Sequence, residues 1–271
     1  MTARPPRLYD GRVVLVTGGT SGLGLGTALA FAAHGARLVL TYKWGSADEA
    51  EIRRSFAAAG AAEPLILEAD VARSADTEAL YAAIGEQCGP IEVLVNCAAP
   101  AVSVRSLADY TERGFLKTMR ASAWPLVDYT MAAKRCLGRY PRYIVTLSSD
   151  GPDRFMPAYD FVAASKAAAE TLTRYLAYRL RDEDVRVNVV RTRGVETHSL
   201  GETFGGDFSS FVRGLVPAGW FIPVEEVANA VFALCSGMFD AMTGQVLMVD
   251  RGSAFSDNIA LLYEQWEARE L

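Results

Sequence analysis

A strand, a glycine-rich turn and a helix follow one another near the start of the chain, and they constrain the fold more than any other feature of its 271 residues. Residues 12–17 (RVVLVT) are apolar and mostly β-branched, which is typical of a buried strand. The turn GGTSGLG follows at 18–24, and an alanine-rich segment at 25–34 predicts a helix. Glycines let a backbone approach a pyrophosphate, whose charge is stabilised by unpaired amide groups and by the helix dipole. The segment therefore predicts a nucleotide cradle rather than a plain tight turn.

Strand and helix patterns alternate along the rest of the chain. Unbroken apolar strands that alternate with helices are typical of a parallel sheet covered on both faces. We therefore expect an α/β fold, a Rossmann-type doubly wound parallel sheet of about seven strands with helices on both faces, in a single domain spanning residues 1–271. The predicted strands lie near 12–17, 36–42, 64–68, 91–96, 142–147, 185–190 and 245–249, and the predicted helices near 23–34, 47–59, 75–88, 107–138, 158–181 and 223–236.

Composition and charge exclude several functional classes. A net charge of −5 provides no general attraction to nucleic acid or to an anionic membrane, and we expect neither as a partner. No apolar stretch approaches transmembrane length, and the first ten residues lack the core of a signal peptide. Together with the lack of CxxC pairs and of clustered histidines, this predicts a reduced, cytoplasmic protein without a metal. The residues concerned are Cys88, Cys97, Cys136, Cys235, His34 and His198.

Six short motifs, in order, resemble those of the short-chain dehydrogenase/reductase superfamily. The resemblance spans about residues 10–252 and implies a nicotinamide cofactor on the glycine-rich loop 17–24. It also implies an Asp-Val pair at the adenine and a serine, a tyrosine and a lysine at the reaction centre. The motifs are TGGTSGLG at 17–24, Asp70-Val71, VNCAA at 95–99, Ser148-Ser149, SKAA at 165–168, and TGQ with VDRG within 242–252.

The resemblance also implies which residues bind the cofactor. The residue after the second strand distinguishes the two nicotinamide cofactors, since an acid there accepts from the ribose hydroxyls and repels a 2′-phosphate. The chain has no acid in Thr41-Tyr42-Lys43-Trp44, so we expect Lys43 to pair with a 2′-phosphate and Trp44 to lie against the adenine. NADPH is thus expected over NADH, although a solvated Lys43 is the alternative. The implied cofactor residues are Gly18, Thr20, Ser21, Gly22, Leu23, Gly24, Lys43, Asp70, Val71, Asn96, Lys166, Gly194, Val195 and Thr197.

The spacing between one tyrosine and one lysine bears most directly on the reaction. The superfamily's lysine, which Lys166 resembles, holds the nicotinamide ribose and lowers the pKa of a tyrosine one helical turn earlier. In this chain that position is Val162, which has no proton to give. Tyr159 lies seven residues before Lys166, which is about two helical turns. We therefore expect both side chains to face one cleft.

This longer spacing favours reduction of a C=C bond. In conjugate reduction, hydride adds to the β-carbon of an α,β-unsaturated carbonyl and negative charge develops on an oxygen three bonds away. The stabilising hydroxyl must then stand further from the hydride-accepting carbon than in ketone reduction. The Tyr-x6-Lys pattern also resembles that of the divergent enoyl-acyl-carrier-protein reductases, and residues 158–180 are most similar to their NADPH-dependent type. The expected substrate is an enoyl thioester or another activated C=C compound, with Tyr159 as enolate stabiliser and proton donor.

Two further function classes stay open. Ser149 lies seventeen residues before Lys166, where carbonyl reductases of the superfamily have their catalytic serine, so reduction of a 3-oxoacyl or secondary-metabolite ketone is one alternative. The other is a catalytically silent nucleotide-binding protein. Ser122 stands where the superfamily has an asparagine that holds a relay water, and a hydroxyl can also bind water. The predicted catalytic residues are therefore Tyr159, Lys166, Ser149 and Ser122.

Charged residues near the predicted site are unusual for a purely aliphatic acyl substrate. Asp150, Asp153 and Arg154 follow the fifth predicted strand, and Arg191 and Arg193 lie at the end of the sixth. We interpret the acidic segment as a solvated loop. The two arginines either bind a phosphate, of the cofactor or of a phosphopantetheine arm, or lie exposed on the surface. The charges also fit a tailoring reductase that acts on a conjugated ketone or acid without a carrier protein.

The last third of the chain is expected to determine the substrate and the subunit contacts. Aromatic residues among glycines in 198–222 suit a lid that closes over an acyl or aromatic substrate, or else ordinary anchors into the core. The tail 253–271 carries apolar residues at helical spacing, which favours a subunit contact. The family resemblance implies a homodimer or homotetramer acting on a small-molecule or carrier-protein-bound acyl substrate.

Overall fold

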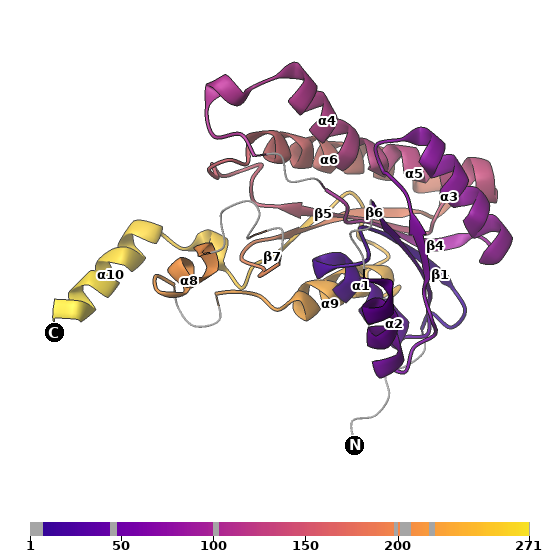
Figure 1. Cartoon of the computed structure of the whole chain (residues 1–271), viewed down its shortest axis with the longest axis horizontal. Coiled ribbons are helices and arrows are strands. Elements are labelled where there is room, and N and C mark those ends of the chain that lie inside the picture. Colours follow the sequence, from indigo (N-terminus) through magenta and orange to yellow (C-terminus); the bar gives the residue numbers. More distant parts are fainter. Residues whose placement is uncertain are drawn as a thin grey trace.

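The computed structural model in Figure 1 describes residues 8–43, 48–99, 103–197, 200, 207–216 and 220–270. Within these residues, seven strands pair in parallel in the order β3-β2-β1-β4-β5-β6-β7. This confirms the predicted doubly wound sheet. The strands are β1 (Val13–Thr17), β2 (Arg37–Tyr42), β3 (Leu65–Glu68), β4 (Ile91–Asn96), β5 (Tyr143–Ser149), β6 (Arg186–Thr192) and β7 (Val246–Val249).

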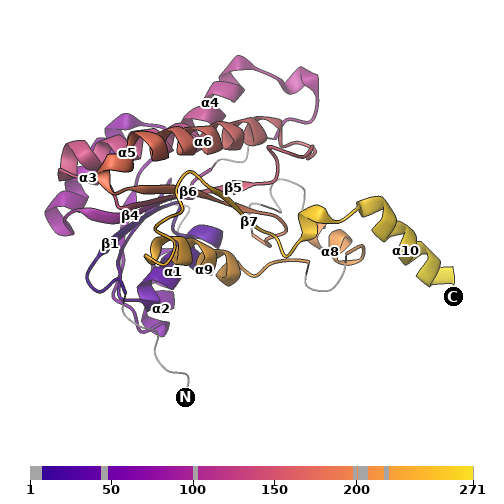
Figure 2. The same ribbon diagram turned by 180° about the vertical axis from the view of Figure 1, so that it is seen from behind.

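Helices cover both faces of the sheet, as Figures 1 and 2 show from opposite sides. One face carries α1 (Gly22–Ala33), α2 (Glu49–Ala58) and α9 (Val224–Cys235). The other carries α3 (Ser74–Gln87), α4 (Glu112–Ser122), α5 (Trp124–Leu137) and α6 (Asp160–Arg179). Two further helices, α8 (Phe208–Arg213) and α10 (Asn258–Glu270), lie beyond β7, and α10 extends away from the sheet. In the described part of the chain, no helix combines the length and the apolar character that a membrane span needs.

The strands are apolar throughout because each one contributes to two cores. Successive side chains of a strand point to opposite faces of the sheet. In β1, Val14 and Val16 pack with the helices of the first face, and Val13 and Leu15 pack with those of the second. This arrangement explains why the strand pattern shows no alternation between apolar and polar residues.

Two helix boundaries differ from the predicted ones. The helix expected at 107–138 is a short 3-10 turn (Leu107–Asp109) followed by α4 and α5. The break falls at Ala123, two residues before Pro125, because proline has no N–H to continue the hydrogen bonds of α4 and is tolerated only in the first turn of a helix. The helix expected at 158–181 begins at Asp160, since Ala158 has a left-handed φ of +64° and forms a bridge with Val104.

The carboxyl ends of four strands form the edge of the sheet where a site is expected. The strands β1 and β4 are neighbours, although β2 and β3 come between them in the chain, so the strand order reverses there. Ligands of open α/β sheets bind at such a reversal, outside the carboxyl ends of the strands. The final residues of the four strands β1, β4, β5 and β6 are Thr17, Asn96, Ser149 and Thr192.

Candidate active site

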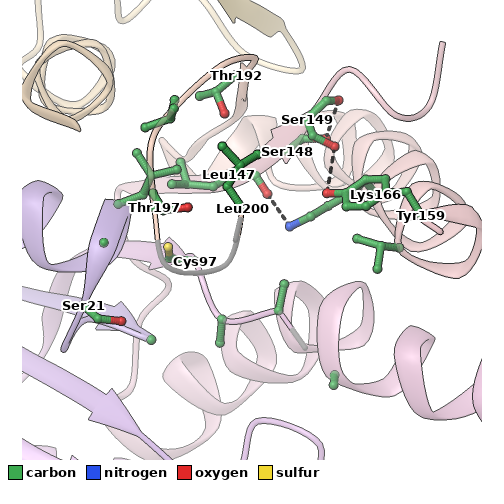
Figure 3. A pocket seen from close by; sticks show the side chains of 18 of the residues that line it. Ser21, Cys97, Leu147, Ser148, Ser149, Tyr159, Lys166, Thr192, Thr197 and Leu200 are labelled. Atoms are coloured by element: carbon green, nitrogen blue, oxygen red, sulfur yellow. Dashed lines mark hydrogen bonds between the residues drawn. The ribbon is translucent and has the colours of Figure 1, made fainter. Parts of the chain in front are cut away.

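A cavity of about 940 Å³ opens at this edge of the sheet. The glycine loop and the ends of β2 and β3 line one end of it, and the segments after β5 and β6 line the other. Figure 3 shows the middle, where Ser149, Tyr159 and Lys166 come together. Most predicted site residues are part of the lining, namely Gly18, Thr20, Ser21, Gly22, Leu23, Lys43, Asp70, Val71, Ser149, Tyr159, Lys166, Gly194, Val195 and Thr197. Gly24, Asn96 and Ser122 are not part of it.

The glycine loop is shaped by close backbone contacts. Gly18 has a φ of +62°, and a Cβ there would lie 3.1 Å from the backbone of Ala98. A Cβ on Gly24 would lie 2.1 Å from the carbonyl oxygen of Gly18, so Gly24 lets α1 pack tightly behind the loop. These contacts require glycine for steric reasons, and they hold the start of α1 at the wall of the cavity.

The start of α1 offers an anion site toward the cavity. Ser21 precedes the helix but its side chain makes no capping hydrogen bond, and the first turn contains no acidic residue. The N–H groups of that turn therefore remain available, and the helix dipole is not offset locally. Thr197 stands opposite, since a Cβ on Gly22 would lie 3.6 Å from its Cγ2 atom. The available N–H groups, with Thr197 beside them, are where the pyrophosphate of a dinucleotide is expected to bind.

Substituting Gly22 by alanine is expected to weaken binding of a nicotinamide dinucleotide about tenfold or more, because the new methyl group stands in the cavity wall at the start of α1, where the pyrophosphate is expected. The matched control is Gly60→Ala. Both glycines have positive φ, +49° and +65°, so both variants carry a backbone strain of about 1–2 kcal/mol, but a Cβ on Gly60 meets no atom within 4 Å. Titration of each variant with NADPH by fluorescence gives the dissociation constants. Equal weakening in both variants would contradict the assignment of Gly22 to the cradle.

The turn after β4 is tied to β1 by a residue that the sequence analysis did not single out. The Thr17 Oγ1 atom accepts hydrogen bonds from the N–H groups of Cys97 (3.1 Å) and Ala98 (3.2 Å), which places these two residues on the cavity wall. The side chain of Asn96 is buried instead, and its amide has no hydrogen-bond partner among the described residues. The position of Thr17 at the end of the first strand, directly before the glycine-rich turn, is the sequence feature that could have indicated this role.

An ion pair stands at the end of the cavity expected to hold the adenine. Lys43 forms a salt bridge with Asp70, and both residues line the cavity. Burial raises the pKa of the Asp70 carboxyl, but the Lys43 ammonium and the N–H of Ala72 outweigh it, so the net pKa lies below its usual value. The carboxylate therefore stays charged and neutralises part of the lysine's charge. Trp44, predicted to lie against the adenine, falls outside the described residues.

Ser149, Tyr159 and Lys166 meet in the middle of the cavity (Figure 3). The Ser149 hydroxyl donates to the Tyr159 hydroxyl at 3.1 Å, and the Lys166 ammonium donates to the backbone carbonyl of Leu147 at 2.8 Å. Tyr159 is the residue immediately before α6, rather than a residue within it. Val162, in the position one turn before the lysine, also lines the cavity. The turn before α6 thus brings Tyr159 to Ser149, and all three predicted groups line one cavity.

Burial determines the protonation of these groups. Burial raises the pKa of Tyr159, the charge of Asp150 adds to the rise, and the hydrogen bond from Ser149 opposes it. The phenol therefore remains protonated at neutral pH, as a proton donor must. Burial lowers the pKa of Lys166, while the nearby groups of Cys97 and Glu170 favour its charged form. The cavity therefore contains a protonated phenol, that of Tyr159, and a buried amine, that of Lys166.

Ser122, the fourth predicted catalytic residue, lies away from the cavity wall. It is buried at the end of α4, and its hydroxyl has no hydrogen-bond partner among the described residues. Its neighbour Ala121 lines the cavity instead. Adjacent residues of a helix point in directions about 100° apart, which explains why Ala121 lines the cavity and Ser122 does not. A relay role for Ser122 stays a prediction.

A buried ion pair lies behind the reacting groups. Glu170 follows Lys166 by one helical turn, accepts a hydrogen bond from Ser148 at 2.7 Å, and binds Arg191 through both carboxylate oxygens at 2.6 and 3.0 Å. Arg191 also pairs with Asp153 and does not line the cavity. Two roles were expected for Arg191, phosphate binding or surface exposure. Neither applies, because Arg191 does not line the cavity and its side chain is only 13% exposed. The i, i+4 spacing of Lys166 and Glu170 on one helix could have indicated that these two side chains lie close together.

The structure describes part of the predicted lid, the segment 198–222. Three of its residues line the cavity, namely Leu200, Phe208 and Trp220, whereas residues 198–199, 201–206 and 217–219 fall outside the described residues. Asp150 also lines the cavity and is only 5% exposed, so its interpretation as part of a solvated loop was wrong. The structure thus places a charged group beside Ser149.

The doubly wound sheet, the glycine cradle and the serine, tyrosine and lysine define an NAD(P)H-dependent oxidoreductase. The family model described as "Enoyl-(Acyl carrier protein) reductase" matches residues 18–254, and the chain belongs to that family, within the short-chain dehydrogenase/reductase superfamily. The enoyl-acyl-carrier-protein reductase (NADH) of Aquifex aeolicus is 28% identical over 251 residues, which cover 90% of this chain and 92% of that enzyme.

Other relatives catalyse other reactions. Human L-xylulose reductase is 30% identical over 246 residues, 89% of this chain and 96% of that enzyme. A short-chain dehydrogenase of Burkholderia cenocepacia, solved in complex with NADP, has a TM-score of 0.80 and 26% identity, with 92% of this chain and 99% of that chain covered. The solved Aquifex aeolicus enzyme has a TM-score of 0.74 and the same identity and coverage. The family is therefore established, and the bond that is reduced is a separate question.

Proposed function

We propose that the protein is an NADPH-dependent reductase of an activated C=C bond in an α,β-unsaturated carbonyl compound. The observation that carries the proposal is the position of Tyr159 immediately before α6, about two turns from Lys166. The nearer position is filled by Val162, an apolar residue in the cavity wall. A donor displaced in this way suits an oxygen that develops charge three bonds from the hydride-accepting carbon.

The chain's own residues then have separate tasks. A bound NADPH supplies the hydride, which adds to the substrate's β-carbon. The Tyr159 hydroxyl, kept protonated by burial, stabilises the resulting enolate and gives it a proton, which is later replaced from solvent. Ser149 orients the phenol through its 3.1 Å hydrogen bond, and Lys166 is held toward the ribose site by the Leu147 carbonyl. The enoyl-acyl-carrier-protein reductases among the relatives favour an acyl substrate on a carrier protein as one form of this chemistry.

Reduction of a ketone is the second candidate, and one contact favours it. The Ser149 and Tyr159 hydroxyls are 3.1 Å apart, so both can approach a single carbonyl oxygen. Two donors on one oxygen stabilise the alkoxide that forms when hydride adds to the carbonyl carbon. The human L-xylulose reductase among the relatives supports the same alternative.

The test uses two substrates with one carbon skeleton, an enone and the corresponding saturated ketone, each incubated with NADPH. The products are identified by mass spectrometry and NMR. We expect the enone to give the saturated ketone, with no alcohol formed from either compound. Formation of alcohol from both would establish ketone reduction instead. If neither compound reacts while NADPH still binds, the proposed activity would be refuted for this substrate class, and enoyl thioesters would be tested next.

The cofactor preference is tested at Lys43. We propose that Lys43, which lines the cavity beside Asp70, pairs with the 2′-phosphate of NADPH. Lys43→Ala is expected to raise KM for NADPH about tenfold and to leave KM for NADH nearly unchanged, since one charge-assisted hydrogen bond is lost. Initial rates with both cofactors measure the change. An equal rise in both KM values would assign Lys43 to another task.

We also propose that the protein forms a homodimer or homotetramer. Large apolar side chains are exposed on α5 and α6, which cover one face of the sheet: Trp124, Met131, Tyr175 and Tyr178. Covering them with a second copy removes this apolar area from water. Light scattering after size exclusion is expected to give two or four chains per particle, and the mass of one chain would contradict the proposal.

A further inference from the structure

Three charged side chains line the cavity next to the reacting hydroxyls and far along the chain from the cofactor cradle. Asp150 directly follows Ser149, Arg154 lies in the loop before Tyr159, and Arg193 is the first residue after β6. None of these three residues has a role in the proposed binding of NADPH. They follow β5 and β6, whereas Lys43 and Asp70 follow β2 and β3, on the other side of β1 and β4 in the sheet.

Arg193 is held in a defined position. Its Nε atom lies 3.4 Å from a carboxylate oxygen of Asp150, and its Nη1 atom donates to the backbone carbonyl of Ser253 at 3.0 Å. The guanidinium carbon is 5.7 Å from the centre of the Trp220 ring, a cation–π distance. Trp220 is itself fixed by Gly194, because a Cβ there would lie 2.7 Å from the ring. Contacts with Asp150, Ser253 and Trp220 thus fix the orientation of the Arg193 side chain, which is only 16% exposed. A ligand that enters the cavity meets a guanidinium that is already oriented.

The charges that reach the cavity wall are mostly positive. Arg154 and Arg193 lie 4.0 and 3.4 Å from a carboxylate oxygen of Asp150, and Arg154 also donates to the backbone carbonyl of Ala254. Two further acids, Glu170 and Asp153, balance the charge of the cluster, but both pair with Arg191 and neither lines the cavity. An anion inside the cavity therefore faces two guanidinium groups and one carboxylate.

We propose that the substrate carries a free carboxylate, bound by Arg193 and Arg154, and that Asp150 sets its affinity. This inference rests on the proposed reductase function and specifies the substrate class of the same site. Planar guanidinium groups match the two oxygens of a carboxylate. The apolar side chains of the same wall, Phe155, Met156, Phe208 and Trp220, surround the rest of the molecule. The substrate is then a short conjugated keto acid or unsaturated acid rather than a long neutral acyl chain.

The place of the arginines argues against a phosphopantetheine phosphate as the anion. That phosphate is separated from the thioester carbonyl by the whole length of the pantetheine arm. Arg193 contacts Asp150, the residue next to Ser149, and Ser149 contacts Tyr159. An anion bound there lies close to the reacting carbonyl, and a short substrate reaches both points at once.

The first experiment compares 4-oxopent-2-enoate with its methyl ester, which have the same enone and differ by one negative charge. With saturating NADPH we expect KM for the acid to be about tenfold or more below that for the ester, as one charge-assisted interaction allows. Equal KM values would overturn the carboxylate proposal while the reductase function stands. If neither compound is reduced, calorimetry with 4-oxopentanoate and its methyl ester in the NADP⁺ complex still tests the site. Tighter binding of the acid is expected, and equal binding overturns the proposal.

Two substitutions are expected to change the preference for the acid over the ester in opposite directions. Structural damage would not produce this pattern. Arg193→Gln is expected to bring the ratio of the KM values for ester and acid down to about one, whereas Asp150→Asn is expected to raise that ratio several-fold because the arginines lose their partner. The exposed Arg181→Gln is the matched control. Arg154→Gln, at a more exposed position, replaces Arg193→Gln if that variant does not fold. A weaker acid preference in Asp150→Asn would overturn the proposal.

Two further measurements test other tasks for Arg193. If Arg193→Gln raises the dissociation constant of NADPH several-fold and leaves the acid preference intact, the guanidinium belongs to the cofactor site. Crotonyl-pantetheine and crotonyl-4′-phosphopantetheine differ only by the phosphate. We expect Arg193→Gln to affect both equally. A selective loss with the phosphorylated compound would identify that phosphate as the bound anion and overturn the proposal.

Discussion

Tyr159→Phe is expected to lower kcat by a factor of about 100 or more and to leave the dissociation constant of NADPH nearly unchanged. The substitution removes only the phenol oxygen, which in this site is the protonated group beside Ser149. Loss of a general acid usually costs two to four orders of magnitude in rate. The phenyl ring retains its packing against Gly151, where a Cβ would lie 2.8 Å from the ring, so the fold is not expected to change.

Tyr175→Phe is the matched control for this variant. Tyr175 belongs to α6 as well, is 64% exposed in the single chain, and does not line the cavity. The substitution keeps the aromatic ring, which is the apolar part of the proposed subunit contact. Single-turnover rates separate the chemical step from cofactor release. Full activity of Tyr159→Phe would show that the displaced tyrosine is not the donor, and the two-turn argument would fail with it.

Lys166→Ala is expected to reduce both cofactor binding and turnover, with a loss of about 1,000-fold in kcat/KM. The ammonium is buried and hydrogen-bonded to Leu147 at the end of β5. Its removal deletes a charged donor to the ribose and leaves that carbonyl without its partner. Two or more interactions of about 1.5–3 kcal/mol each account for the expected size.

The control for Lys166→Ala is Lys117→Ala, an exposed lysine of α4. Fluorescence titration with NADPH and steady-state rates are measured on both variants, together with circular dichroism to verify folding. Unchanged NADPH affinity in folded Lys166→Ala would assign the lysine to the chemical step alone. Rates equal to those of the unsubstituted protein would remove it from the active site.

Local patterns predicted the elements of this fold well, because they depend on residues close in the chain. The apolar run of β1 and the glycines after it define a strand and a nucleotide cradle wherever they occur. The proline at 125 was visible in the sequence, yet the helix was predicted to continue through it. Backbone strain at Ala158 was not visible, since alanine gives no sign of a left-handed φ.

The doubly wound fold, the glycine-rich turn after β1 and the seven-residue separation of Tyr159 and Lys166 could be read from the sequence. They follow from side-chain periodicity and from the spacing of residues close together in the chain, which are local properties. Which charges line the cavity depended on tertiary contacts. Arg191 pairs with Glu170, whereas Arg193 pairs with Asp150, although the two arginines are only two residues apart in the chain. Their partners lie on other elements, and ion pairs between distant segments depend on strand order and loop paths that no local pattern encodes.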